Sequence, residues 1–285
     1  MQTKKSFFRR HTGKILSIFV VLTFFVPFFI YADDLITVIA DGQAVLGEDT
    51  TPAWARSLAL NNARRAAIEK ASGVKVHGLS VVYNYQLISD LISAFSKGLI
   101  VKEEVLMDDL KADGKNVTYF IRIKAHVKPL EHKKPGSFRI VKAEVFRAGE
   151  TSNTKNPVFQ NNDEIQIRVG VNSDLFLNIF SVSQDGRITK LLPNRYFKND
   201  RASTDRDFIF PDDIQRVTGL KLRVHSPKSL SSALETILIV ATKEKVELLS
   251  NSKQAENTIT DLMYELSELD QSLWVDKTIG YEVRR

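Results

Sequence analysis

Clustered carboxylates are the residues in this sequence whose types and spacing could do chemistry. Two carboxyl groups that face one substrate can catalyse hydrolysis, and several oxygen ligands together can bind calcium. Acidic side chains are also the ordinary residues of exposed turns, where they bond to nearby backbone. The sequence favours the turn interpretation and predicts no catalytic residue, while a hydrolase stays as the third alternative for function. The clustered acids are Asp108, Asp109, Asp113, Asp205, Asp207, Asp212 and Asp213.

Metal and cofactor chemistry is not indicated by the other reactive side chains. The chain has no cysteine, which excludes disulfides, thiolate metal ligands and a cysteine nucleophile. His126 and His132 are six residues apart and have no third ligand at a suitable spacing. The sequence contains no glycine-rich phosphate loop, no G-x-S-x-G and no H-E-x-x-H. We therefore expect no metal, no cofactor and no enzymatic activity.

A row of basic side chains is the remaining candidate for a binding site. Residues 117–127 predict a half-buried antiparallel strand, because apolar and basic residues alternate along it. The basic row could contact a partner or an anionic surface, or it could be the solvated face of a sheet. The apolar set is Ile121, Ile123, Ala125 and Val127, and the basic row is Arg122, Lys124, His126 and Lys128.

The net charge of +6 comes mainly from the first fourteen residues. Five of the 40 basic residues lie there with no acid among them, which leaves 35 basic residues against 34 acidic ones in the rest of the chain. A body so close to neutral argues against a nucleic-acid partner.

An apolar run, ILSIFVVLTFFVPFFIYA, follows this basic start and spans residues 15–32. A basic segment, an apolar run and a small residue before Asp33 and Asp34 are typical of a secretory signal. We expect residues 1–32 to be a signal peptide, cleaved after Ala32, and the protein to be periplasmic. The alternative is a chain anchored to the inner membrane by residues 15–32, since the run is about as long as a membrane span, roughly 20 residues. That anchor would be the chain's contact with the membrane.

The elements of residues 33–128 predict an α+β domain. Thr51, Pro52 and Gly73 mark the two ends of a long helix. Alanine recurs at every fourth position, at residues 55, 59, 63, 67 and 71, which lets the helix lie close to a sheet. Strands before and after it, the last two joined at Asp113-Gly114, predict one long helix on a small antiparallel sheet.

Residues 129–137, PLEHKKPGS, have the composition of a linker. Residues 138–285 then predict a mainly antiparallel, β-sandwich-like domain with a late helix over 256–270. Within it, 175–182 is apolar on both faces, as in a strand that is covered on both sides. Asp185-Gly186 predicts a hairpin turn after that strand.

The first domain resembles a known family in four stretches of sequence. These are "DGQAVLG", "ARSLALNNARRAAIEKASGVKV", "SKGLIVKEEVLMDD" and "YFIRIKAHV". They are similar to the N-terminal domain of flagellar assembly protein T, which builds the periplasmic H ring, and to related surface-lipoprotein domains. The resemblance implies a periplasmic assembly role.

The second domain resembles the bacterial domain of unknown function 4384. The similarity rests on "DEIQIRVGVNSDLFLNIFSVSQDGRITKLLPN", on the region of Pro211 and on "LETILIVATKE". It implies a binding or assembly module and brings no activity with it.

These observations together predict a secreted, periplasmic, non-catalytic protein of the bacterial cell envelope. It would act through contact with an envelope protein, in a flagellar or similar assembly. An envelope glycan- or anionic-lipid-binding module that uses the basic row is the second hypothesis, and an envelope hydrolase is the third.

Overall fold

The computed structural model describes nine stretches of the chain, which are residues 35–47, 51–73, 97–113, 116–130, 137–150, 157–183, 187–226, 231–250 and 257–285. These residues are mainly β-structure with few helices, arranged in several antiparallel sheets, as the sequence predicts. The predicted signal, its cleavage point at Ala32, His132 and the Asp185-Gly186 turn lie outside the described residues.

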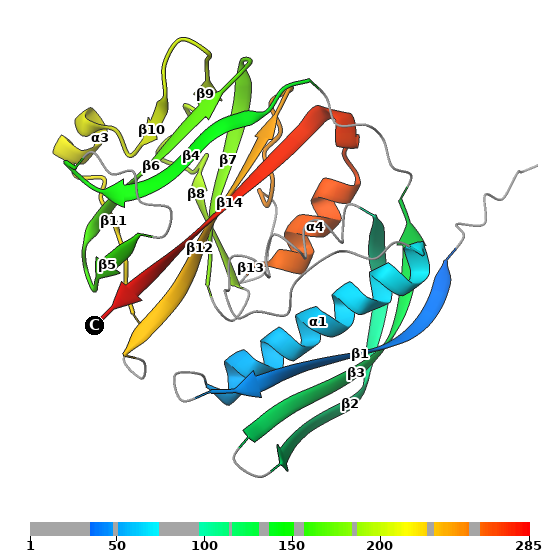
Figure 1. Cartoon of the computed structure of the whole chain (residues 1–285). Helices are drawn as coiled ribbons and strands as arrows, with labels where there is room; N and C mark the ends of the chain where they lie inside the picture. The colour runs from blue at the N-terminus through cyan, green and yellow to red at the C-terminus, as the bar shows by residue number, and fades with distance from the viewer. Residues whose placement is uncertain are drawn as a thin grey trace, which may run out of the picture. The chain divides into compact units, whose positions relative to one another are not determined.

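The first part of the chain contains one long helix and three strands (Figure 1). The strand order is β1-β3-β2, so β3 is central and both of its neighbours pair with it antiparallel. Pairing of β2 with β3 continues to Asp113 and Asn116, which confirms the predicted hairpin, although Gly114 is not among the described residues. The bounds are β1 Ile36–Leu46, α1 Pro52–Ser72, β2 Gly98–Asp113 and β3 Asn116–Pro129.

Helix α1 lies against β1 at a distance that leaves no room for a side chain between them. A Cβ added to Gly42 would come within 2.0 Å of the carbonyl oxygen of Ala59 and 2.3 Å of the nitrogen of Ala63. The four alanines at 55, 59, 63 and 67 are fully buried, whereas Ala71 is partly exposed. The helix begins at Pro52 and ends at Ser72, and Gly73 follows with a φ of 69°. The side of the helix that carries the alanines therefore packs closely on the sheet, as the spacing of the alanines predicts.

Two arginines of α1 reach across to the edge strand β2. Arg56 Nε donates to Asp108 at 2.7 Å, and Arg64 donates to both carboxylate oxygens of Glu103. Strand β2 also carries two irregularities in its pairing, one between Ile100 and Lys102 and one between Val105 and Met107. Inward-pointing ion pairs thus attach this edge strand to the helix.

The second part of the chain contains two sheets. One has the order β10-β6-β11, with β4 also paired to β6, and the other has the order β13-β8-β7-β12-β14-β5, with β9 paired to β7. The β14-β5 pair is parallel. The elements are β4 Ile140–Arg147, β5 Val158–Gln160, β6 Glu164–Val171, β7 Leu175–Val182, β8 Arg187–Leu192, β9 Arg201–Ala202, β10 Phe208–Phe210, α3 Asp213–Val217, β11 Leu222–Arg223, β12 Ser232–Thr242, β13 Asn257–Thr258, α4 Ile259–Ser267, the 3₁₀ turn η1 Gln271–Leu273 and β14 Trp274–Arg284.

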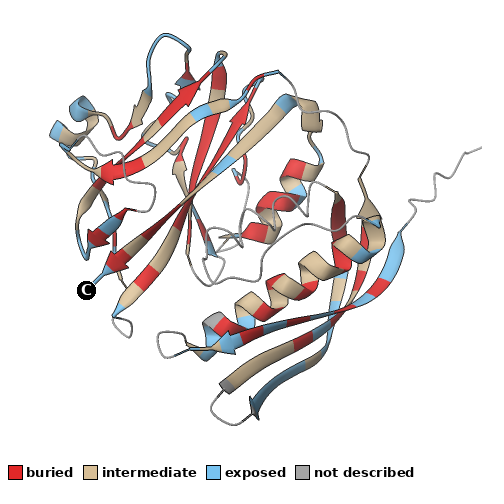
Figure 2. Ribbon diagram, viewed as in Figure 1, coloured by how far each residue is buried: buried red, intermediate tan, exposed pale blue. Residues whose placement is uncertain are grey.

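Buried side chains from these two sheets form one hydrophobic core. Strand β7 contributes Leu177 and Ile179 to this core, while Phe180 on its other face belongs to a second core that includes buried residues of α4 and α1. Both faces of β7 are thus buried, as its apolar run predicts (Figure 2). Asn178 is a polar residue among these buried apolar side chains. It is fully buried, and its amide bonds the backbone of Val246 and Leu248. The predicted late helix is α4, which buries Ile259, Leu262, Met263 and Leu266.

Replacing Gly42 with alanine should destabilise the protein by roughly 3 kcal/mol, because the new methyl group meets helix backbone that no rotamer change can move. Urea unfolding followed by circular dichroism measures this. Gln43→Ala is the matched control, since Gln43 is exposed and its bond to Asn62 comes from its backbone oxygen. Equal stability of the two variants would show that α1 does not lie this close to β1.

Candidate functional site

The predicted basic row lies on the outer face of the β1-β3-β2 sheet. Arg122 bonds both carboxylate oxygens of Asp41, at 2.6 and 3.0 Å, and lowers the pKa of that carboxyl below its ordinary value. His126 Nδ1 lies 2.9 Å from the hydroxyl of Thr37. Lys124 lies between Ile39 and Glu104 in the register of the three strands. The four basic residues therefore share one face, as predicted, but acidic residues lie among them.

The clustered acids are distributed among separate partners. Asp108 is engaged by Arg56, Asp207 by Lys142 at 3.2 Å, and Asp205 by the hydroxyl of Ser203. Within the described residues, no group of three or more Asp, Glu or His side chains is placed to hold a metal ion. Among the same residues, no helix is long and apolar enough to cross a membrane.

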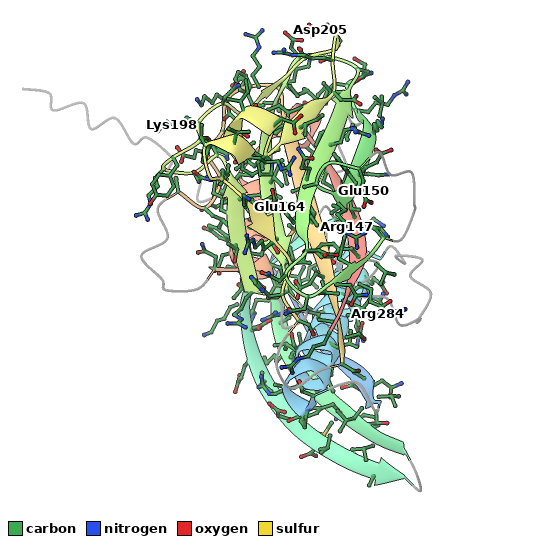
Figure 3. All side chains as sticks on the ribbon, turned by 90° about the vertical axis from the view of Figure 1, so that its left-hand side faces the viewer. Arg147, Glu150, Glu164, Lys198, Asp205 and Arg284 are labelled. Atoms are coloured by element: carbon green, nitrogen blue, oxygen red, sulfur yellow. The ribbon has the colours of Figure 1, made fainter. Side chains whose placement is uncertain are left out.

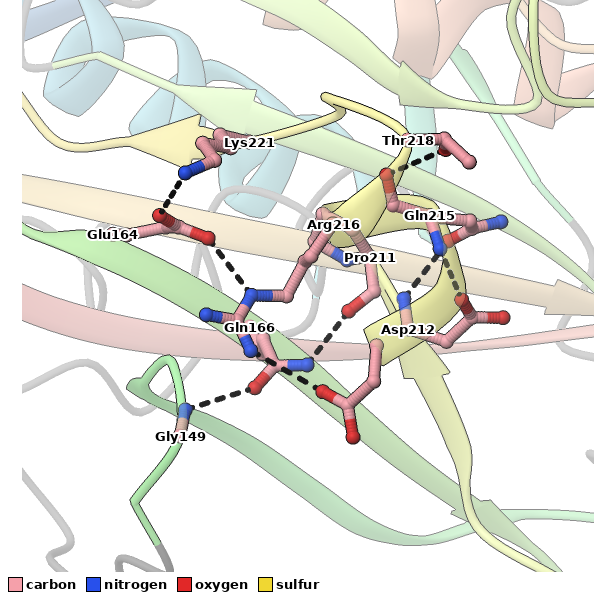
Figure 4. Close-up of polar contacts among 10 residues, drawn as sticks. Gly149, Glu164, Gln166, Pro211, Asp212, Gln215, Arg216, Thr218 and Lys221 are labelled. Carbon is pink, nitrogen blue, oxygen red and sulfur yellow. Dashed lines mark hydrogen bonds and ion pairs between the residues drawn. The ribbon is translucent and has the colours of Figure 1, made fainter.

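Asp212 and Asp213 do have a defined structural role, because they begin helix α3. The carboxylate of Asp212 accepts a hydrogen bond from the backbone of Gln215 at 2.7 Å, and the side chain of Gln215 accepts one from the backbone of Asp212 at 2.9 Å (Figure 4). At the other end, the hydroxyl of Thr218 donates to the Gln215 carbonyl. This capping box stabilises a helix of only five residues.

The segment that contains α3 is bonded to β6 by two polar side chains. Gln166 is buried, and its amide donates to the carbonyl of Pro211 at 2.8 Å while accepting from the backbone nitrogen of Gly149 at 3.3 Å. Glu164 accepts from Arg216 at 2.8 Å and lies 3.5 Å from Lys221. The bond from Arg216 lowers the pKa of the Glu164 carboxyl. Figure 3 shows the position of Glu164 on this side of the molecule.

Helix α3 exposes its apolar residues to solvent, which is the opposite of the usual arrangement in a surface helix. The side chain of Gln215 bonds the helix's own N-cap and that of Arg216 bonds Glu164 of β6, whereas Ile214 and Val217 are 77% and 89% exposed. A surface helix ordinarily turns its apolar residues toward the core. The two exposed aliphatic side chains on a helix that is hydrogen-bonded to β6 are therefore the candidate site.

The sequence places Asp212 and Asp213 in a turn and predicts neither helix α3 nor a role for Gln166, Ile214 or Val217 in a site. A signal was present, because Asp212 and Gln215 have the spacing of a capping box. A helix that begins there places Ile214 and Val217, three residues apart, on one side. Their exposure depends on Glu164 and Gln166, which lie about fifty residues away, so local sequence does not reveal it.

Asp276 is the described carboxyl with the most strongly raised pKa. Burial in β14 raises its pKa from the ordinary 3.8 to about 6, and this rise is opposed first by a hydrogen bond from its own backbone and then by the charge of Lys277. Its neighbour in the register is Val240 of β12, which is fully buried. Asp276 thus lies beside an apolar strand, and burial is the main cause of its raised pKa.

Comparison with known proteins gives one family match. Residues 158–245 match the family described as Domain of unknown function (DUF4384). This confirms the predicted similarity of the second part of the chain over a narrower range than 138–285, and the matched range includes β6 and α3. No curated protein matches the chain. The resemblance of the first domain to flagellar assembly protein T stays a prediction.

Replacing Gln166 with leucine should destabilise the protein by about 2 kcal/mol, because the Pro211 carbonyl and the Gly149 amide would lose their partner. Gln160→Leu, at an exposed position of β5, is the control and should leave the unfolding midpoint in urea almost unchanged. If both variants unfolded at the same urea concentration, the contacts of Gln166 would not stabilise the α3 segment.

Asp276→Asn should make the protein more stable at pH 7, by up to about 3 kcal/mol. The folded state binds a proton at Asp276 more tightly than the unfolded state, so the native protein loses stability as the pH rises from about 4 to 6. The asparagine variant lacks this loss, and the two proteins should converge below pH 4. Urea unfolding at a series of pH values measures the difference. Asp109→Asn, at an exposed carboxyl, should show no such pattern.

Proposed function

We propose that this chain is a secreted, non-catalytic protein of the bacterial cell envelope that acts by binding another protein through α3. The observation that supports this is the exposure of Ile214 and Val217 on a helix that Arg216 joins to Glu164 of β6. Burial of two aliphatic side chains in a partner could contribute about 1.5–3 kcal/mol each. The hydrogen bonds that already hold the α3 segment reduce the conformational entropy that binding would cost.

The envelope location and the division into modules are parts of the same proposal. The basic and apolar N-terminal residues predict export. We treat residues 33–128 as an α+β module and residues 138–285 as a β-sandwich-like module, joined by the linker 129–137. The resemblance to a flagellar H-ring domain that the sequence of the first module predicts would fit an assembly role in the periplasm.

A binding function accounts for the α3 region better than catalysis does. The polar groups beside the exposed aliphatic residues are engaged with one another, since Arg216 bonds both Glu164 and Asp213. A hydrolase would need two carboxylates directed at one substrate. The acids near α3 instead cap the helix or pair with basic side chains. The exposed side chains of Ile214 and Val217 are therefore better explained by contact with a partner than by catalysis.

Site-specific cross-linking tests the proposal in cells. A photoreactive residue at Val217 should cross-link to a defined envelope protein that mass spectrometry can identify, and the same residue at Val45 should not. Val45 is the control position because it is 57% exposed but lies on β1.

The double variant Ile214→Ser and Val217→Ser should weaken binding of the identified partner by roughly a hundredfold, because two buried aliphatic contacts are lost. The control is Val45→Ser with Val141→Ser, two positions that are each 57% exposed. Calorimetry with the purified proteins measures both affinities. Equal affinity of the native protein and the α3 variant would contradict the proposal.

A further inference from the structure

The loop that follows β8, residues 194–199, holds one exposed aromatic residue in place, and we name it the Tyr196 loop. The amide of Asn194 donates to the carbonyl of Leu191 at 2.7 Å. Its side-chain oxygen accepts from the backbone nitrogens of Tyr196 and Phe197 at 2.8 and 2.9 Å. Phe197 packs edge-on against a ring of the hydrophobic core. Tyr196 is 70% exposed, so the loop presents it to solvent on an ordered backbone.

Arg195 lies over the ring of Tyr196 and has no carboxylate partner among the described residues. The central carbon of its guanidinium is 4.5 Å from the ring centroid, which is a cation–π contact. One ring cannot use the five N–H donors of a guanidinium, so donors remain for an anion. Other arginines of the described chain are paired with carboxylates, among them Arg56, Arg64, Arg122, Arg147, Arg168 and Arg216.

The charge that the Tyr196 loop itself presents is positive. Arg195 and Lys198 are exposed, and residues 190–199 contain no acid. Figure 3 shows Lys198 at the edge of the molecule, away from Asp205. The six nearby acids lie beside other basic residues, as Asp174 with Arg201, Asp205 with Arg206, Glu244 with Lys243, and Asp200, Glu247 and Glu265 with Lys190 and Lys245. Seven basic residues thus face six acids, and the two without an acidic partner among the described residues are those of the loop.

These groups fit a protein segment that carries a carboxylate beside an apolar residue. A planar guanidinium bonds a carboxylate through two parallel N–H donors. Tyrosine and arginine are enriched at protein interfaces and are among the residues that contribute most to binding. A lipid surface fits less well, because two positive charges attract an anionic bilayer only weakly.

The attachment of the loop lowers the entropic cost of such binding. Beyond the bonds of Asn194, the backbone nitrogen of Leu177 in β7 donates to the carbonyl of Asp200 at 2.7 Å, which fixes the far end of the loop. Tyrosine offers a large contact area with only two side-chain torsions to order. Arg195 is already placed by its contact with the ring. A partner would therefore meet a surface that needs little reorganisation.

We propose that the Tyr196 loop binds an acidic peptide segment of a partner protein. A carboxylate of the segment pairs with Arg195, and an adjacent apolar side chain covers the ring of Tyr196. Lys198 attracts a further acidic residue of the same segment. This contact uses neither Ile214 nor Val217, so it and the binding proposed for α3 can fail independently.

Selection from a random peptide library tests this with a chain that begins at Asp33, since residues 34–285 form one compact unit. Dodecapeptides displayed on phage are first depleted on the double variant Arg195→Ala with Tyr196→Ala and then selected on the native protein. Peptides that bind only the native protein should be enriched in Asp and Glu next to an apolar residue. If no peptide distinguished the two proteins, or if those that did had no excess of acidic residues, the proposal would be wrong.

Variants at single positions show how the loop binds a selected peptide. Tyr196→Ser should weaken binding at least about tenfold, and Arg195→Lys should also weaken it because lysine cannot form two parallel bonds to one carboxylate. The matched controls Tyr264→Ser and Arg206→Lys, at exposed positions outside the loop, should leave the affinity almost unchanged. Fluorescence anisotropy of the labelled peptide measures these affinities, and salt should weaken the native complex.

The remaining outcomes also decide the question. Equal losses in the loop variants and their controls would show that the surface as a whole attracts the peptide, and would overturn the proposal. Purified peptidoglycan is the competing ligand. Sedimentation with it that Tyr196→Ser abolished, while no peptide was selected, would assign the loop to a glycan instead. Unchanged urea midpoints in all variants exclude unfolding as the cause.

Discussion

Helix α1 can lie on its sheet only because Gly42 has no side chain and the facing helix residues are alanines. A Cβ at Gly42 would overlap the backbone of Ala59 and Ala63, so strand and helix backbones are in direct contact. Arginines on either side of this contact extend beyond it to β2. The small residues determine how close the layers are, and the long ones attach the far strand. The geometry of the sheet, including the direction of its outer face, depends on that spacing.

Helices α1 and α3 are attached to their sheets by different physical means. Helix α1 is fixed by the exclusion of water from a tightly packed apolar contact, which is non-directional and depends on buried area. Helix α3 has no buried residue and is fixed by directional hydrogen bonds from Gln166, Glu164 and its own cap. Directional bonds can hold a short segment in one orientation without using its apolar side chains. Ile214 and Val217 are therefore available for contact with another molecule.

Most of the regular structure follows from signals that are local in sequence. Thr51, Pro52 and Gly73 determine where α1 begins and ends, and the period of two in 121–128 determines which residues of β3 face outward. The pairing of Arg122 with Asp41 could not be predicted, because it depends on the register between strands that are 81 residues apart. The exposure of α3 could not be predicted either. It depends on a bond from the buried side chain of Gln166 to Pro211, which lies 45 residues later in the chain. Local patterns predict elements, whereas sites depend on the long-range contacts between them.

The edge strand β2 has a further property that follows from its ion pairs and irregularities. A strand of sixteen residues at the edge of the described sheet, with exposed Val101, Leu106 and Leu110, would ordinarily be a template for the addition of a strand from another molecule. The two interruptions of register break the regular spacing of its outer amides and carbonyls, and Glu103 and Asp108 place charge beside them. An incoming strand would lose hydrogen bonds at both interruptions. The same features that join β2 to α1 thus protect the protein against edge-to-edge aggregation at high local concentration.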